Sequence, residues 1–414
     1  MDAETYVRQI HSDLLDVLAP EKFLVPPSAS PAQPGRSQAL AEDLIGALEN
    51  PCHYPPLGQS VFPGDRVAIA LQTGLAHDLE LVTSLVEQLI GHGIEPADIS
   101  VVVSGLQARQ LGFSQSETED GSPSDALNNA VGCFKQIGGR DIHFQIHHAD
   151  SASHLAYLAA NEAGDPMHVN RVLVDADVIV PVGYPDPGAA SNHDDCLYPT
   201  FAATAVQERF NSREITTADR AAEVELANDT LGSFYAIQVV TGPGNRVHQI
   251  VAGSRKDVLA TARSACRELW EIDSVEMKPM VVATIETTFG EPQWNDFLRA
   301  VLNASRISDA NAPIVVWTNL SRRPDRQFRS AFQSQFEESV NPKLSVELQH
   351  LVAVLQERRV YLRSELSQDV VETLGLGFVS SVSDIYRLSE NVSGSWLLRD
   401  AHRFQVRENP QAVV

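Results

Sequence analysis

The apolar residues of this chain recur with two different periods, and the two periods alternate along the sequence. Asp78–His92 carries apolar side chains at the spacing of one helical face, and Gly93 follows it as a residue that ends helices. On either side, Arg66–Leu71 and Ile99–Val103 are short runs of small and β-branched residues, as in strands buried on both faces. This order of strand, helix and strand predicts a crossover unit with parallel strands.

The same alternation continues on both sides of a boundary near Ser274. Before it, strands are predicted at Ile142–Ile146, Val172–Val182, Ile237–Val240 and Val247–Val251, and helices at Ser37–Leu48, Ala152–Ala160 and Arg255–Glu271. After it, strands are predicted at Met280–Ile285, Pro313–Trp317, Val360–Leu362 and Phe378–Val382, and helices at Asn295–Ala304, Ser345–Glu357 and Ser367–Leu374.

The two runs together predict an α/β protein of two domains, each a mainly parallel sheet flanked by helices, with a cleft between them. We place the first domain at residues 1–274, completed by the chain end at 395–414, and the second at residues 275–394.

The net charge of the chain disfavours two classes of binding partner. With 31 Lys and Arg against 54 Asp and Glu, the formal net charge of −23 opposes binding to nucleic acid or to an anionic membrane surface. The longest apolar stretch, Val172–Val182, is too short to span a membrane. Met1–Ala19 carries acids throughout and reads as an amphipathic helix rather than a secretory signal, which favours a cytoplasmic location.

Polar side chains that could bind a ligand or transfer protons follow two of the predicted strands. His193 lies in Asn192–Cys196, after the strand Val172–Val182, where open α/β sheets bind ligands. Its imidazole could ligate a metal or transfer protons, although this Asx-rich turn could equally cap the next helix. His147 and Asp150 follow Ile142–Ile146 and leave the same choice between ligand contacts and helix capping.

Two further segments could bind an anion. Arg322 and Arg323 follow the strand Pro313–Trp317 and could attract a carboxylate or phosphate into the cleft, or form a solvated surface cluster. Gly242–Arg246 could present backbone amides to a phosphate, or be a plain hairpin turn.

Several segments resemble the nickel-dependent lactate racemase family. The most specific is Gly164–Gly183, which reads GDPMHVNRVLVDADVIVPVG and is similar to the core strand of that family. Gly64–Ala70 is similar to the entry into its first strand, His147–Asp150 to a His-Asp segment, and Ala252-Gly253 to a turn before a helix.

The resemblance implies a two-domain fold and racemisation of a small 2-hydroxy acid in the interdomain cleft. It implies a nickel-pincer nucleotide that is attached to a lysine, takes up a hydride from the substrate and works with proton-transferring histidines. Carried over to this chain, it gives His193 and Arg109 as catalytic residues, with His193 as the metal ligand. Asn170, Arg171, His147, Asp150, Arg322 and Arg323 would bind substrate or cofactor.

Several family positions are occupied differently here. Leu106–Arg109 keeps only the arginine of a segment that carries a catalytic histidine in the family, and Thr73–His77 lacks the arginine of another. No lysine occurs between Lys135 and Lys256, so the cofactor cannot be covalently attached in the expected region. Two hypotheses therefore stand: a divergent racemase acting on a small carboxylate, or a non-catalytic relative that binds a small anion or a protein partner.

Overall fold

A computed structural model gives the structure of the chain. It describes residues 23–24, 36–72, 78–103, 133–137, 139–185, 197–211, 215–232, 235–242, 246–272, 277–285, 292–337, 341, 344–390, 392 and 394–406. The chain divides into two compact units. The first unit comprises Pro31–Thr241 and Arg246–Cys266, and the second comprises Met1–Ser30, Gly242–Asn245 and Arg267–Val414.

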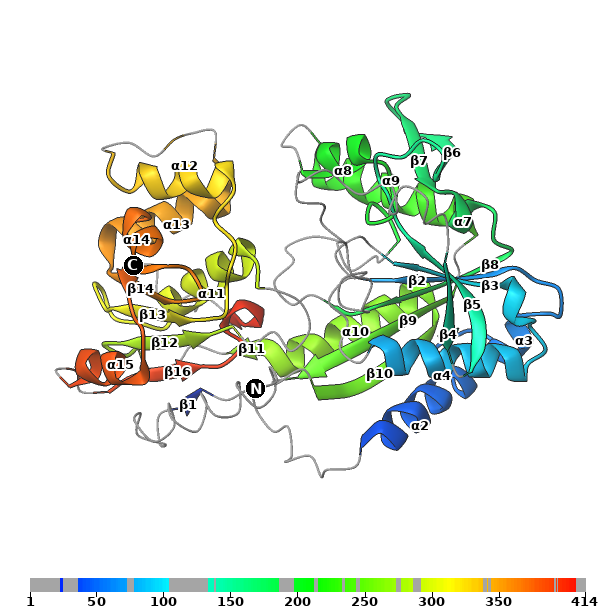
Figure 1. Ribbon diagram of the computed structural model, residues 1–414, viewed down its shortest axis with the longest axis horizontal. Coiled ribbons are helices and arrows are strands. Elements are labelled where there is room, and N and C mark those ends of the chain that lie inside the picture. Colours follow the sequence, from blue (N-terminus) through cyan, green and yellow to red (C-terminus); the bar gives the residue numbers. More distant parts are fainter. Residues whose placement is uncertain are drawn as a thin grey trace. The chain divides into compact units, whose positions relative to one another are not determined.

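A seven-stranded sheet forms the centre of the first unit (Figure 1). Its strands, in spatial order, are β10 (Arg246–Ser254), β9 (Tyr235–Gly242), β8 (Val178–Gly183), β2 (Val67–Leu71), β3 (Ile99–Val103), β5 (Arg140–Ile146) and β4 (Cys133–Ile137). The strands from β9 to β5 pair in parallel, and β4 pairs antiparallel with β5. The predicted parallel crossover from β2 to β3 is therefore present.

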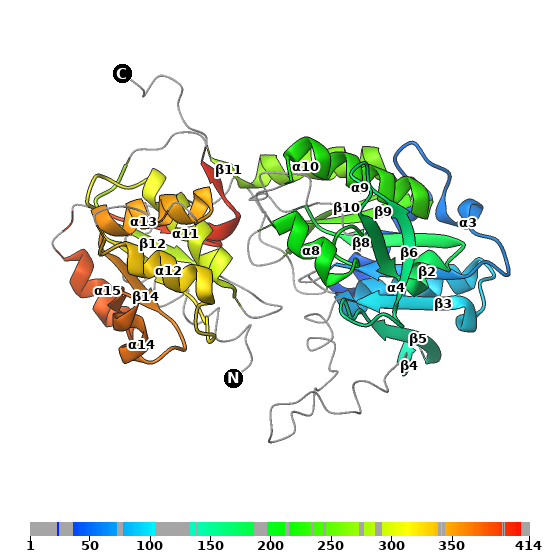
Figure 2. The same cartoon turned by 90° about the horizontal axis from the view of Figure 1, so that it is seen from above.

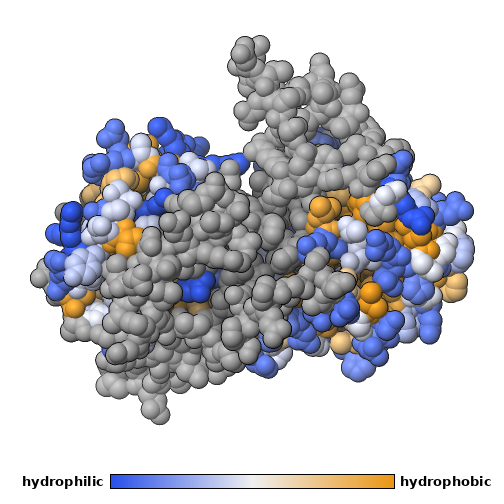
Figure 3. Space-filling view, turned by 60° about the horizontal axis from the view of Figure 1, so that its bottom comes forward, coloured by the Kyte–Doolittle hydropathy of each residue, from blue (hydrophilic) through white to orange (hydrophobic). Residues whose placement is uncertain are grey.

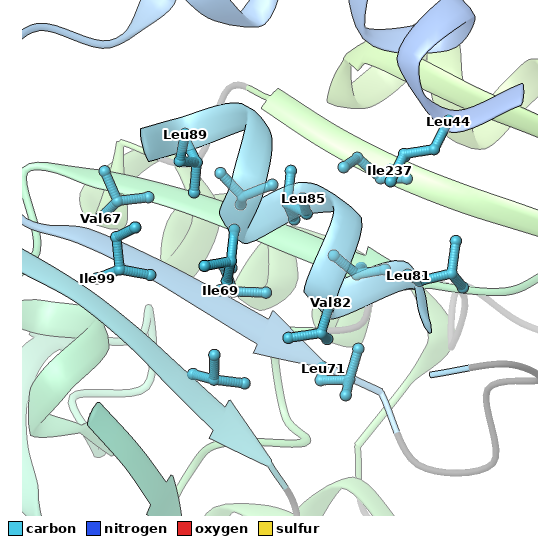
Figure 4. Close-up of a cluster of buried hydrophobic side chains, with 14 of the residues drawn as sticks. Leu44, Val67, Ile69, Leu71, Leu81, Val82, Leu85, Leu89, Ile99 and Ile237 are labelled. Atoms are coloured by element: carbon cyan, nitrogen blue, oxygen red, sulfur yellow. The ribbon is translucent and has the colours of Figure 1, made fainter. Parts of the chain in front are cut away.

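Helices cover both faces of this sheet. On one face lie α2 (Arg36–Glu49) and α4 (Asp78–Gly91), and on the other α7 (Arg171–Val174), α8 (Thr204–Asn211) and α9 (Thr217–Leu231) (Figure 1). Figure 4 shows Val82 and Leu85 of α4 on the side of the helix that faces Ile69 and Leu71 of β2. Burying one such side chain stabilises the fold by about 1.5–3 kcal/mol relative to leaving it exposed. The layered arrangement buries the apolar face of the helix against the apolar strands, so it is favoured.

The hairpin of β6 (Leu155–Ala160) and β7 (Pro166–Asn170) differs from the prediction. These strands form a separate antiparallel pair, whereas the sequence predicted a helix over Ala152–Ala160. The alanines favour a helix locally, but hydrogen bonds to β7 override that preference. The next element also differs, because Asn170 caps the single turn of α7 and β8 begins only at Val178.

A six-stranded, entirely parallel sheet forms the second unit. Its spatial order is β1 (Phe23–Leu24), β16 (Trp396–Leu398), β12 (Val281–Thr284), β13 (Ile314–Trp317), β14 (Val360–Arg363) and β15 (Gly377–Phe378). Its helices are α11 (Trp294–Arg306), α12 (Arg326–Ser334), α13 (Val346–Glu357), α14 (Gln368–Thr373) and α15 (Val382–Ser389). The predicted fold class, mainly parallel α/β sheets flanked by helices, is confirmed.

The domain limits differ from those expected. The helix α10 (Arg255–Trp270) runs without a break past the end of the first unit at Cys266, and Figure 2 shows it as one long helix. The chain end at 395–414 was expected to complete the first domain; β16, within that segment, lies between β1 and β12 in the sheet of the second unit. That segment is too short for its pairing partner to be inferred from sequence.

The described surface mixes hydrophilic and hydrophobic residues, as the face in Figure 3 shows. Large exposed apolar side chains are scattered over both units, and they include Phe62, Tyr157 and Phe336. Among the described helices, none is long and apolar enough to pass through a membrane.

Candidate functional site

The carboxyl edge of the first unit's sheet is where the family resemblance predicts a site. The parallel strands β2, β3, β5 and β8 end at this edge, at Leu71, Val103, Ile146 and Gly183. Three of the segments that follow, residues 73–77, 104–132 and 186–196, lie outside the described residues. They contain Arg109 and His193, which therefore stay predictions.

His147, directly after β5, is held on both sides of its ring. Its backbone N–H donates to the carbonyl of Val103 at 2.7 Å, which continues the pairing of β5 with β3. Nε2 lies 3.1 Å from the carbonyl of Ala202, and Nδ1 lies 3.3 Å from the side-chain amide nitrogen of Asn170. Because a carbonyl only accepts and an amide N–H only donates, Nε2 carries the hydrogen and Nδ1 accepts.

The surroundings of His147 keep its imidazole neutral. Burial lowers its pKa to about 4, and the nearby rings of His148 and His154 act in the same direction. The ring also meets Phe201 edge to face at 5.6 Å. In the described structure His147 is a buried, neutral cross-link between β5, β7 and the segment before α8.

Asn170 and Arg171 have structural contacts of the same kind. The carboxamide oxygen of Asn170 accepts from the backbone N–H of Val172 and so caps α7, and the residue is fully buried. The guanidinium of Arg171 donates to the backbone carbonyls of Ser153 (3.3 Å) and Leu155 (2.8 Å). The motif that carried the resemblance therefore fastens α7 to the β6–β7 hairpin.

Asp150 fixes the start of α8. Its Oδ1 accepts a hydrogen bond of 2.5 Å from the hydroxyl of Thr204, the first residue of that helix. The expected helix after Asp150 is absent, since β6 occupies this stretch. The carboxylate acts on a helix 54 residues further along the chain, a distance that local capping rules cannot cover.

The sequence pattern did not single out His154, which lies beside His148. The two ring centroids are 5.3 Å apart, and His154 is buried. Nε2 of His148 and Nδ1 of His154 are buried without a hydrogen-bond partner. Burial and the neighbouring His154 lower the pKa of His148. Within the described parts of the chain, no group of three or more His, Cys, Asp and Glu residues is arranged to hold a metal ion.

Arg322 and Arg323 lie in the second unit, beyond β13. Both side chains are exposed, and the backbone carbonyl of Arg322 accepts a 2.9 Å hydrogen bond from the indole N–H of Trp294. Arg363, at the end of β14, carries no signal in the sequence that singles it out, and its guanidinium lies 5.3 Å over the Trp317 ring. The in-register pairing of Trp317 with Arg363 places the two side chains on one face of the sheet.

Part of the sequence matches the model of a known domain family. Residues 19–187 match the model of the lactate racemase N-terminal domain. Over this part, the chain is similar to lactate racemases. No curated protein sequence matches this chain.

Two solved structures share the fold of this chain. One is the lactate racemase apoprotein from Thermoanaerobacterium thermosaccharolyticum, with a TM-score of 0.60 and 12% identity over 94% of this chain and 99% of that one. The other is a protein from Thermotoga maritima, with a TM-score of 0.57 and 13% identity over 91% of this chain and 99% of that one. At these identities the likeness concerns the fold.

Proposed function

We propose that this lactate-racemase-like protein binds a small carboxylate without racemising it. The proposal rests on the absence of a lysine where the cofactor would be attached. The segment after β8 contains no lysine, and none occurs between Lys135 and Lys256. Lys256 lies on α10, where its Nζ is 2.6 Å from a carboxylate oxygen of Glu225. The residues present do not fit a lysine-attached nickel-pincer nucleotide.

His147 supports the same reading. Both of its ring nitrogens are engaged by structural partners, Ala202 and Asn170, and its pKa of about 4 leaves the ring neutral near pH 7. A proton-transfer group needs a free ring nitrogen within reach of the substrate and a pKa near the working pH. His147 meets neither requirement in this structure.

The choice of a carboxylate as ligand is supported by the arginines near strand ends. Arg109 follows β3 in the sequence, and Arg322 and Arg323 follow β13. Ligands of open α/β sheets bind outside the carboxyl ends of the strands, and guanidinium groups pair with carboxylates through two parallel hydrogen bonds. A small 2-hydroxy acid has the charge and size that such groups recognise.

The catalytic part of the proposal is tested by making the protein together with the enzymes that synthesise the nickel-pincer nucleotide. We expect nickel and extra sulfur far below one per chain, no pincer absorbance, and no interconversion of D- and L-lactate. Nickel near one per chain would contradict the proposal. Racemisation that is lost in His193→Ala and retained in Cys196→Ala would establish the enzyme instead.

The binding part is tested by calorimetry with lactate. Arg109→Ala should weaken lactate binding about tenfold or more, which corresponds to about 1.4 kcal/mol. Arg140→Ala is the matched control, because Arg140 is an exposed arginine at the start of β5 and so lies at the edge of the sheet opposite the carboxyl ends of the strands. If lactate and other 2-hydroxy acids fail to bind the folded protein, the ligand class is wrong.

A further inference from the structure

A cavity in the first unit lies at the turn between β6 and β7, against α8 and α9. Its volume is about 680 Å³. Small-molecule sites in proteins typically enclose about 300–1,000 Å³, so a compact ligand fits. The lining residues come from Asn161–Asp165, from Arg209 of α8, and from Ile215–Leu226 at and after the start of α9. None of the residues proposed above for carboxylate binding lines it.

The floor of this cavity is a polar network centred on the buried carboxylate of Glu223. Glu223 is only 4% exposed, and its carboxylate accepts from the hydroxyl of Tyr198, the guanidinium of Arg209 and the side-chain amide of Asn161. Arg209 also donates to Asp165 at 3.2 Å. Asn161 reaches the same Asp165 oxygen at 3.3 Å. These bonds hold the floor rigidly in place.

The charge around the cavity is strongly one-sided. Four carboxylates line it, those of Glu162, Asp165, Asp219 and Glu223, against the single guanidinium of Arg209. Because Arg209 already pairs with Glu223 and Asp165, its charge is compensated from within the protein. An anion entering the cavity would meet the remaining negative charge, whereas a cation would be attracted by it.

One wall of the same cavity is apolar. Ile215, Ala222 and Leu226 contribute to it, and Leu226 is 37% exposed although it is a large apolar side chain. A ligand with an alkyl body would cover this surface and gain about 25 cal/mol for each Å² of apolar area removed from water. The wall therefore favours an organic cation over a hydrated metal ion.

We propose that this cavity binds a small organic cation, an ammonium or guanidinium group on a short alkyl body. The charged group lies between the carboxylates of Glu162, Asp165 and Asp219, and the alkyl body lies on Leu226. The site is separate from the proposed carboxylate-binding function, so either can fail without the other.

Calorimetry with 1,4-diaminobutane tests this site. We expect one saturable site that weakens as NaCl is raised, because salt screens exposed charges. Butanoate should not bind, and ammonium chloride at equal concentration should not displace the diamine, because ammonium lacks the alkyl body.

A pair of matched variants assigns the binding to the cavity. Glu162→Gln/Asp219→Asn removes two lining charges while keeping similar side-chain shapes, and it should weaken diamine binding at least tenfold. Glu208→Gln/Asp229→Asn removes the same number of charges from exposed positions on α8 and α9 outside the cavity lining, and it should change binding less than twofold. Thermal melts followed by circular dichroism check that both variants fold.

Two results would overturn the proposal. The first is no detectable binding of 1,4-diaminobutane to the folded wild-type protein. The second is equal weakening in both double variants, since that would mean general attraction to an acidic protein of net charge −23 rather than a site.

Discussion

Glu223→Ala should lower the free energy of unfolding of the first unit by about 3–5 kcal/mol. The carboxylate is buried and accepts from Tyr198, Arg209 and Asn161, and these three groups come from outside α9. Its removal takes a buried carboxylate partner from Arg209 and takes the acceptor from the buried Tyr198 hydroxyl. Urea denaturation followed by circular dichroism measures the change.

The control for this variant is Glu208→Ala on α8. Glu208 is exposed, so its substitution should change the free energy of unfolding by no more than about 0.5 kcal/mol. A loss below about 1 kcal/mol in Glu223→Ala would mean that water replaces the carboxylate in the network. In that case the network does not join the β6–β7 hairpin to α8 and α9.

Acidification should destabilise the first unit through His147. Its pKa is about 4 in the folded protein, against an ordinary value of 6.5. Above pH 6.5 the ring is neutral in both states and contributes no pH dependence. Between pH 6.5 and 4 only the unfolded state takes up the proton, so folding loses stability as the pH falls. The loss reaches about 3 kcal/mol at pH 4, at 1.36 kcal/mol for each pKa unit.

The contribution of His147 is separated from that of other histidines by comparison with His147→Gln. His143 and His148 also have pKa values lowered by burial, so the wild-type slope contains several groups. The free energy of unfolding of His147→Gln should fall less steeply with decreasing pH. Between pH 6 and 4.5, its slope should be smaller than that of the wild type by about 1.4 kcal/mol per pH unit, which corresponds to the uptake of one proton. Parallel slopes for the two proteins would show that His147 titrates normally in the folded state.

Much of the sheet framework follows from local pattern. β2, α4 and β3 lie within two residues of their predicted limits, because strands buried on both faces and a helix with one apolar face leave distinct periods in the sequence. Ala152–Ala160 was predicted wrongly, because the strand β6 exists only through its pairing with β7. The segment Val172–Val182 misled for a related reason. Its valines predicted a strand, but the first of them belong to a single helical turn that is capped by Asn170.

The candidate site was less accessible to sequence reasoning. His147 and Asp150 were correctly placed at the end of a strand, but their partners Ala202 and Thr204 lie more than 50 residues further on. The Glu223 network was missed altogether, since its members are spread from Asn161 to Glu223 and each looks like an ordinary surface residue in its own segment. Only the folded hairpin brings them together.

The short strand β1 has a consequence for dissecting this protein. Phe23–Leu24 pairs with Leu397–Leu398 and thereby covers the outer side of β16, although the two segments stand at opposite ends of the chain. A fragment beginning at residue 277 would carry the rest of its sheet with that backbone edge unpaired. Unpaired edges recruit other strands, so such a fragment should self-associate, and adding residues 1–30 as a separate peptide should reduce that association.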